Sequence, residues 1–324
     1  MLRKPRNVRE FQAWLYERLS VLFPTFHKQI TTLTELIDKV YSLDLDRAID
    51  IVAPLYSHTG RPSKDPLAML RALLCGVSLG IQSITKLVSL LKSSPVLATI
   101  SGFDPEDTPG VGTFYDFMYR LWGEDKKRFA MRKNQRKSLK NRETKSFVDG
   151  PISKADEPIS ETLAYAVMDN SFPLDPNSSI LNQIFYRCIV AKSEMMGLLK
   201  SPQDNKTLLS GDGTLIDSGA SQHGIKDCDC KSKGISHCDC PRRFSDPDAR
   251  FGWDFHNDTY VFGYNLYTII AVTDSGPLPV SFTLQGAHTN DCLMCLLAMN
   301  SYLLPHNLCP KPRLPAHLNI QGFK

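Results

Sequence analysis

The chain of 324 residues is long enough for two ordinary domains. Apolar residues make up 42% and charged residues 22% of it, which excludes a fibrous or a wholly disordered protein. The net charge of +4 is too small to indicate a partner by itself. The N-terminus lacks the apolar core of a signal peptide, and the longest apolar stretch, 72–81, is about half a membrane span. We therefore expect a cytoplasmic protein with no membrane partner.

The first third of the chain has the apolar spacing of helices joined by short turns. Asp65 and Pro66 form a typical helix start, and Ser93-Ser94-Pro95 separates two short helices. Thr113 is expected to cap the last helix of this region. The predicted helices span 8–22, 33–40, 66–79, 84–91, 96–100 and 113–121.

A basic segment follows the helical region. Between Lys126 and Lys145 there are ten Lys or Arg residues and a single acid, Glu143. Such a run suits a polyanion, because its positive charges attract phosphates irrespective of sequence; a solvated linker is the alternative. We treat 123–160 as a basic linker between two domains.

The remainder, 161–324, begins with helical patterning up to residue 200 and then changes to strands. Segments rich in β-branched and aromatic residues predict strands. A helix is expected between the third and the fourth strand, because Thr289 or Asn290 can cap its start. The expected strands are 207–216, 260–272, 279–284 and a run within 315–323, with the helix at 289–304. This order indicates an α/β domain.

Four of the nine cysteines form two Cys-x-Cys pairs separated by seven residues: Cys228, Cys230, Cys238 and Cys240. Two such pairs can place four sulfur atoms tetrahedrally around Zn²⁺. Reduced thiols in a surface loop are the alternative. A zinc ion held by four thiolates would be structural, because no position is left for a water molecule. The odd total does not suggest a secreted disulfide framework.

Several segments resemble bacterial insertion-sequence transposases of the DDE type with an InsH-type N-terminal domain. The first runs from GRPSKDPLAMLRALL, at Gly60, to Leu121, and the second is LLSGDGTLIDSGAS, 208–221. The third is CDCPRRFSDPDARFGWDFHNDTYVFGYNLYTIIAV, 238–272, whose SDPDARFGWD spelling is distinctive. AHTNDCLMCLLAM, 287–299, is similar to the segment after the third strand of the same family.

The resemblance implies a fold and a set of roles. Residues 1–122 would be a helical, helix-turn-helix-like domain that binds double-stranded DNA at transposon ends, with 84–91 or 113–121 in the major groove. Residues 161–324 would be an incomplete RNase H-like α/β domain with a Cys-rich insertion at 218–258. Asp212 would be the first catalytic carboxylate and a Mg²⁺ ligand, whereas Asp291 matches an acid outside the catalytic set. DNA contacts are expected at Arg61, Lys64, Lys86, Lys126, Lys127, Arg128, Arg132 and Lys133.

The sequence also departs from the family. DDE chemistry requires three carboxylates around two divalent ions. The second Asp would follow a strand at His317–Ile320, but no acid lies between that strand and Lys324. We therefore expect a C-terminally truncated transposase that is inactive alone. Three possibilities remain open: a non-enzymatic DNA-binding remnant of a transposase, a zinc protein that does not bind nucleic acid, and assembly into a homo-oligomer.

Overall fold

The computed structural model describes residues 1–122, 131–132, 176–200 and 207–303, except 227, 236–237, 239, 241, 247 and 275. Contacts divide these residues into two compact units. The first joins the residues up to 122 with Ile180–Gly197, and the second holds the others. Residues 180–197 therefore lie with the N-terminal helices, although the sequence analysis placed them in the second domain. The basic segment, apart from 131–132, and the strand expected within 315–323 lie outside the described residues.

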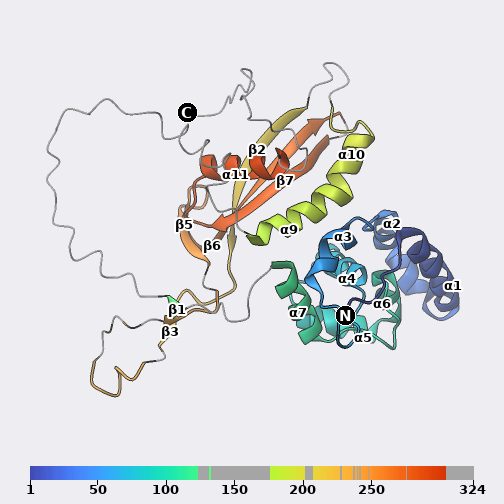
Figure 1. The fold of residues 1–324 in the computed structure, drawn as a ribbon, viewed down its shortest axis with the longest axis horizontal. Coiled ribbons are helices and arrows are strands. Elements are labelled where there is room, and N and C mark those ends of the chain that lie inside the picture. The colour runs from blue at the N-terminus through green and yellow to red at the C-terminus, as the bar shows by residue number, and fades with distance from the viewer. Residues whose placement is uncertain are drawn as a thin grey trace. The chain divides into compact units, whose positions relative to one another are not determined.

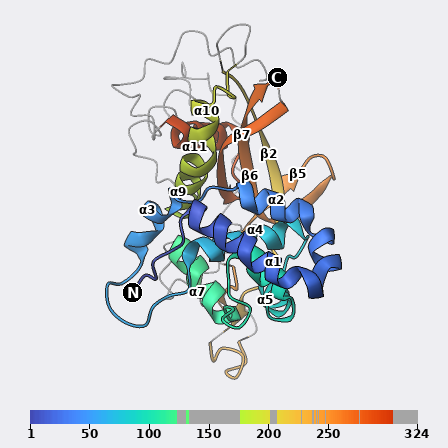
Figure 2. The ribbon, with the colours of Figure 1, turned by 90° about the vertical axis from the view of Figure 1, so that its right-hand side faces the viewer.

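The first unit is helical (Figures 1 and 2). Its α-helices are α1 (Val8–Thr32), α2 (Thr34–Ser42), α3 (Ala48–Val52), α4 (Pro66–Ser78), α5 (Ile84–Ser93), α6 (Pro95–Ser101) and α7 (Val111–Trp122), with a 3₁₀ turn at Ala53–Leu55. To these are added α9 (Pro176–Phe185), a π-helical stretch at Tyr186–Val190 and α10 (Ala191–Met195). Within the described residues, no helix is both long enough and apolar enough to cross a bilayer.

Several helix limits differ from the prediction by one or two residues, and the end of the first helix differs by ten. The first helix continues past Pro24 to Thr32 instead of ending at Leu22, with non-helical dihedral angles at Phe26. Proline bends the helix without ending it here, because Phe26 and Ile30 beyond the bend still pack against the core. Helix α7 begins at Val111, so Thr113 lies in its first turn and is not the cap.

Other helix starts agree with their sequence signals. The Asp65 side chain accepts hydrogen bonds from the backbone N–H groups of Leu67 (2.8 Å) and Ala68 (3.4 Å), and Pro66 is the first helical residue. Ser94 caps α6 through the N–H of Leu97, at 3.1 Å. These caps satisfy N–H groups that the helices leave without internal partners.

The second unit contains a four-stranded antiparallel sheet of β2 (Leu208–Asp217), β5 (Arg250–Asp254), β6 (Thr259–Thr273) and β7 (Gly276–Gly286). The long strand β6 pairs with the other three, each in antiparallel register. All the strand pairs in the described part of the sheet are therefore antiparallel. The second unit combines strands with a helix, which agrees with the expected mixed α/β composition. The three predicted strands are found with limits that differ by one to three residues.

Helix α11 (Asp291–Leu303) covers one face of this sheet (Figure 1). Met294, Leu297 and Ala298 are buried against it, and the Ser281 hydroxyl donates to the Ala298 carbonyl oxygen at 2.8 Å. The Asn290 side chain accepts from the N–H of Leu293 at 3.0 Å, so the predicted capping by Asn290 is confirmed. This packing fixes which residues of each strand face the helix.

A second, three-stranded sheet consists of β1 (Met131–Arg132), β4 (Arg242–Arg243) and β3 (Ile225–Lys226), in that order. Both pairs are antiparallel. The cysteine-rich loop between β3 and β4 is thus closed at its base by two strands.

Candidate functional site

The face of β2 that Asp212 occupies follows from its glycine neighbours. A Cβ atom built on Gly213 would overlap the Asp291 carboxylate, and one built on Gly211 would lie 2.8 Å from the Tyr267 ring. Both glycines therefore face α11 and the residues packed beneath it. Because successive residues of a strand point to opposite faces, Asp212 points away from α11.

Asp212 is exposed on that other face. It pairs across the sheet with Thr268, and its Oδ1 accepts a hydrogen bond from the N–H of Gly213 at 2.9 Å. In the part of the chain that the structure describes, it belongs to no group of three His, Cys, Asp or Glu side chains close enough to share a metal. Asp217, at the end of the same strand, is also exposed. Asp212 is thus an accessible carboxylate that shares no such ligand group among the described residues.

The face of the sheet that α11 covers carries a polar contact that the sequence analysis did not predict. The buried Asn265 amide donates to Asp291 Oδ1 at 2.9 Å and to the Thr289 carbonyl oxygen at 3.0 Å. These bonds fasten the first turn of α11 to β6. Burial raises the pKa of the adjacent Tyr267, as do the Cys295 thiol and the charges of Asp291 and Asp212, so its phenol stays protonated. Asp291 therefore has a structural partner, and its expected position outside the catalytic set stays a prediction.

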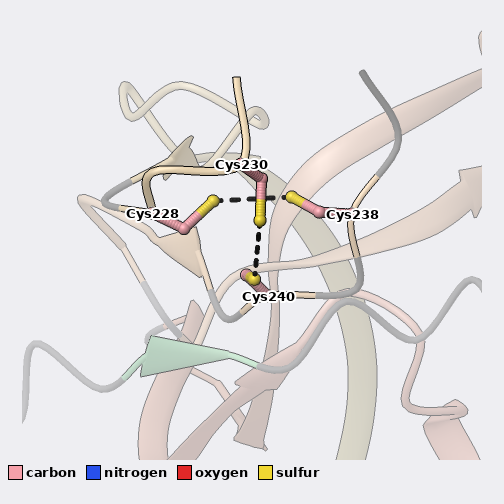
Figure 3. Close-up of side chains that lie close together, drawn as sticks. All are labelled: Cys228, Cys230, Cys238 and Cys240. Carbon is pink, nitrogen blue, oxygen red and sulfur yellow. Dashed lines mark hydrogen bonds between the residues drawn. The ribbon is translucent and has the colours of Figure 1, made fainter. Parts of the chain in front are cut away.

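The four cysteines of the Cys-x-Cys pairs do come together (Figure 3). Their sulfur atoms all lie within 4.8 Å of one another, with Cys228 and Cys238 at 3.5 Å and Cys230 and Cys240 at 3.5 Å. Tetrahedral zinc with Zn–S bonds of about 2.3 Å requires sulfur separations of roughly 3.8 Å, which falls inside this range. Four converging thiols can hold a metal ion such as zinc.

The backbone between the pairs is a compact turn. The N–H of Ile235 donates to the Cys230 carbonyl at 2.8 Å, and Gly234 adopts a left-handed φ of +73°. Glycine is suited to this conformation because it has no Cβ to clash with the backbone. The turn reverses the chain, so that the second Cys-x-Cys pair returns to the first.

The cysteine sulfurs polarise one another. The backbone N–H of Cys230, followed by the Cys238 thiol, lowers the pKa of Cys228 to about 7. The pKa of Cys230 is raised to about 12, first by its hydrogen bond with Cys240. Metals bind the thiolate form of cysteine, so the lowered pKa of Cys228 favours metal binding at that residue.

The residues expected to contact DNA are placed as follows. Arg61 precedes α4 and Lys86 lies in the first turn of α5, and both are exposed. Lys64 forms an ion pair with Asp107, which Arg3 also contacts at 3.4 Å. Arg132 belongs to β1, whereas Lys126, Lys127, Arg128 and Lys133 lie outside the described residues. All of these assignments stay predictions.

One further anchor was missed by the sequence analysis. The Asp246 carboxylate accepts hydrogen bonds from the Ser218 hydroxyl at 2.6 Å and the Tyr264 hydroxyl at 2.5 Å. It also accepts from the N–H groups of Asp248 and Ala249. Asp246 thus ties the SDPDAR segment to the residue that follows β2 and to a residue inside β6. The Asp-Pro-Asp spelling signals a turn, but it does not identify the distant partners.

The comparisons with known proteins bear on the helical unit. Residues 25–120 match the family model described as Transposase domain (DUF772). This range runs from the second half of α1 through α7, so that part of the chain is similar to transposases. No curated protein and no solved structure matches the chain.

Proposed function

We propose that this protein binds double-stranded DNA at the ends of an insertion sequence and takes part in transposition of the DDE type. The observation that carries the proposal is the match of residues 25–120 to a transposase domain. Transposition acts on chromosomal DNA, so a cytoplasmic location belongs to the same proposal.

The helical unit would recognise the DNA. Helices α5 and α7 are the candidates for the major groove, because each follows a turn and carries exposed positions beside a buried face. Lys86 on α5 and Arg61 before α4 are exposed cations that can bind phosphates. These contacts would place the protein in register on the duplex, and base contacts from one of the helices would supply specificity.

The second unit would be the RNase H-like part. Support comes from the order along the chain: the Asp212 strand, the long insertion, two further strands and then α11, as the resemblance implies. Asp212 would offer one oxygen ligand to Mg²⁺ from the face opposite α11. Among the described residues, Asp212 belongs to no group of three or more potential ligands, so they do not by themselves supply the ligand set of a two-magnesium site. Two-ion chemistry needs further carboxylates, and no step is assigned to this one alone.

Zinc would be a structural ion in the four-cysteine cluster. The sulfur separations and the absence of an open ligand position support this role. Bound zinc would hold the loop between β3 and β4 in one conformation, because the loop has little apolar core of its own.

The test compares binding and cleavage on duplexes that carry the element's terminal sequence or a shuffled one. We expect tighter binding to the terminal duplex and an affinity that falls linearly with the logarithm of salt concentration. Equal, weak binding to both duplexes even at low salt would contradict the proposal.

Among the described residues, Asp212 joins no group of three potential metal ligands, which favours a second candidate function, a DNA-binding protein without strand-cleaving activity. Mg²⁺-dependent nicking of the terminal duplex separates the two. Nicking that is lost in the Asp212→Asn variant supports the DDE role. Specific binding without nicking supports the non-enzymatic one.

A further inference from the structure

The small sheet brings basic residues into one row. Arg242 in the central strand β4 has Lys226 of β3 as its partner on one side and Arg132 of β1 as its partner on the other. Three positions that are adjacent across three strands are thus all basic, although they lie far apart in the sequence.

Like charges at directly opposite positions of neighbouring strands destabilise a sheet. A row of basic positions can attract a polyanion, whose phosphates release their counterions on binding. The row also unites the cysteine-rich loop with a residue of the basic segment 126–145, through Arg132. The backbone arrangement therefore assembles positive charge from two regions of the chain.

More positive charge lies at the tip of the loop. Lys231 and Lys233 flank Ser232 in the turn, and all three are exposed. The turn is held by hydrogen bonds from the N–H of Lys233 to the carbonyl oxygens of Asp229 and Cys230, both at 3.2 Å. The acids of the segment, at positions 227, 229 and 239, each adjoin a cysteine, whereas the basic residues occupy the turn and the strands.

We propose that the cysteine-rich segment, residues 225–243, is a second DNA-binding site that grips the phosphate backbone without reading sequence. A metal ion on the four cysteines would fix the turn that carries Lys231 and Lys233, and so hold their ammonium groups in place. This proposal rests on the proposed binding of DNA and extends it from the helical unit to the second unit. The rival role for these lysines is to neutralise the negative charge of a four-thiolate zinc centre.

The experiment uses the full chain loaded with zinc, and a random-sequence duplex whose binding is followed by fluorescence anisotropy over a salt series. The variant is Lys231→Gln/Lys233→Gln. The matched control is Lys28→Gln/Lys200→Gln, which removes the same charge at two exposed positions elsewhere. Each lost phosphate contact reduces the magnitude of the slope of log K against log salt by about 0.9. We therefore expect the magnitude to decrease by about 1.8 in the variant and to change little in the control.

Zinc content and the rate of zinc release to a chelator are measured on the same samples. Unchanged zinc retention with the reduced slope supports the proposal. An unchanged slope with faster zinc release shows that the lysines serve the metal centre, and it overturns the proposal. The variant Cys228→Ser/Cys238→Ser should lose zinc and show the reduced slope as well. If it loses zinc and keeps the parental slope, the metal does not organise the site and the proposal fails.

These outcomes are separable from failure of the proposed function. A parental chain that binds neither the random nor the terminal duplex contradicts DNA binding as a whole. If the parental chain binds DNA and the lysine variant shows the same salt slope, only this second site is ruled out. The helical unit then remains the proposed DNA-binding part.

Discussion

Gly213→Ala tests the arrangement around Asp212 directly. The new methyl group would overlap the Asp291 carboxylate, and it would lie 2.9 Å from Asn265 Oδ1 and 3.0 Å from Asp291 Cγ. Asp291 cannot swing away without cost, because its Oδ1 accepts the hydrogen bond of the buried Asn265 amide. The substitution therefore pushes the first turn of α11 away from β2 and β6.

The expected cost is about 1–3 kcal/mol, the usual range for overpacking in a well-filled site. Alanine also restricts the unfolded chain more than glycine, which offsets about 0.4–1 kcal/mol. Gly219→Ala is the matched control, since a Cβ there meets no atom within 4 Å and the residue does not have a positive φ. It should be neutral or slightly stabilising.

Hydrogen exchange followed by mass spectrometry is the suitable assay, because it reports β2 and β6 separately from the helical unit. A loss of 1–3 kcal/mol corresponds to exchange that is faster by roughly one to two orders of magnitude. Truncating the obstructing side chain should relieve the overlap. The double variant Gly213→Ala/Asp291→Ala is therefore expected to be less destabilised than the sum of its single variants, with a coupling of about 0.5–3 kcal/mol.

Two results would refute this reasoning. One is exchange in Gly213→Ala that matches the Gly219→Ala control. The other is strict additivity with Asp291→Ala, which would mean that the two residues do not meet. Either result would also withdraw the assignment of Asp212 to the face opposite α11, because that assignment depends on Gly213 facing Asp291.

Three further predictions concern other parts of the molecule. Asp212→Asn should change the stability of the sheet by less than about 0.5 kcal/mol, as judged by hydrogen exchange, because the side chain is exposed; a large loss would show a structural role. Cys228→Ser should abolish zinc binding in metal analysis and speed exchange within the cysteine-rich segment, whereas the exposed Cys292→Ser control should retain one zinc per chain. Ile184→Ala, at a side chain 8% exposed, should cost about 2–4 kcal/mol in denaturant unfolding of the helical unit, against little for Ile189→Ala, which is 42% exposed; equal effects would mean that α9 does not pack on that unit.

Sequence alone predicted elements whose signals are local. The Asp65-Pro66 start and the Ser94-Pro95 break give helix limits because capping depends on the nearest backbone N–H groups. The predicted end of the first helix at residue 22 was wrong, since the helix bends after Pro24 and continues to reach the core. Tertiary packing determines where this helix ends, and local helix propensity carries no information about tertiary packing.

The candidate sites divide in the same way. The spacing of the Cys-x-Cys pairs was compatible with convergence on a metal ion and also with separate surface thiols; the structure brings the four together, because a short turn closes the loop between them. The face of Asp212 was not predictable: alternation along β2 requires Asp212 and Gly213 to point to opposite sides, but only the position of α11 shows which side is covered. The Asn265–Asp291 contact was missed because its partners lie 26 residues apart.

DNA binding by the full chain tests the central claim most directly. The measurement is a competition of labelled terminal duplex from the element against unlabelled terminal and shuffled duplexes at physiological salt. Preferential displacement by the terminal sequence, weakening steadily as salt rises, is the predicted result. Equal displacement by both competitors, or no complex at low salt, would contradict a role in recognising transposon ends.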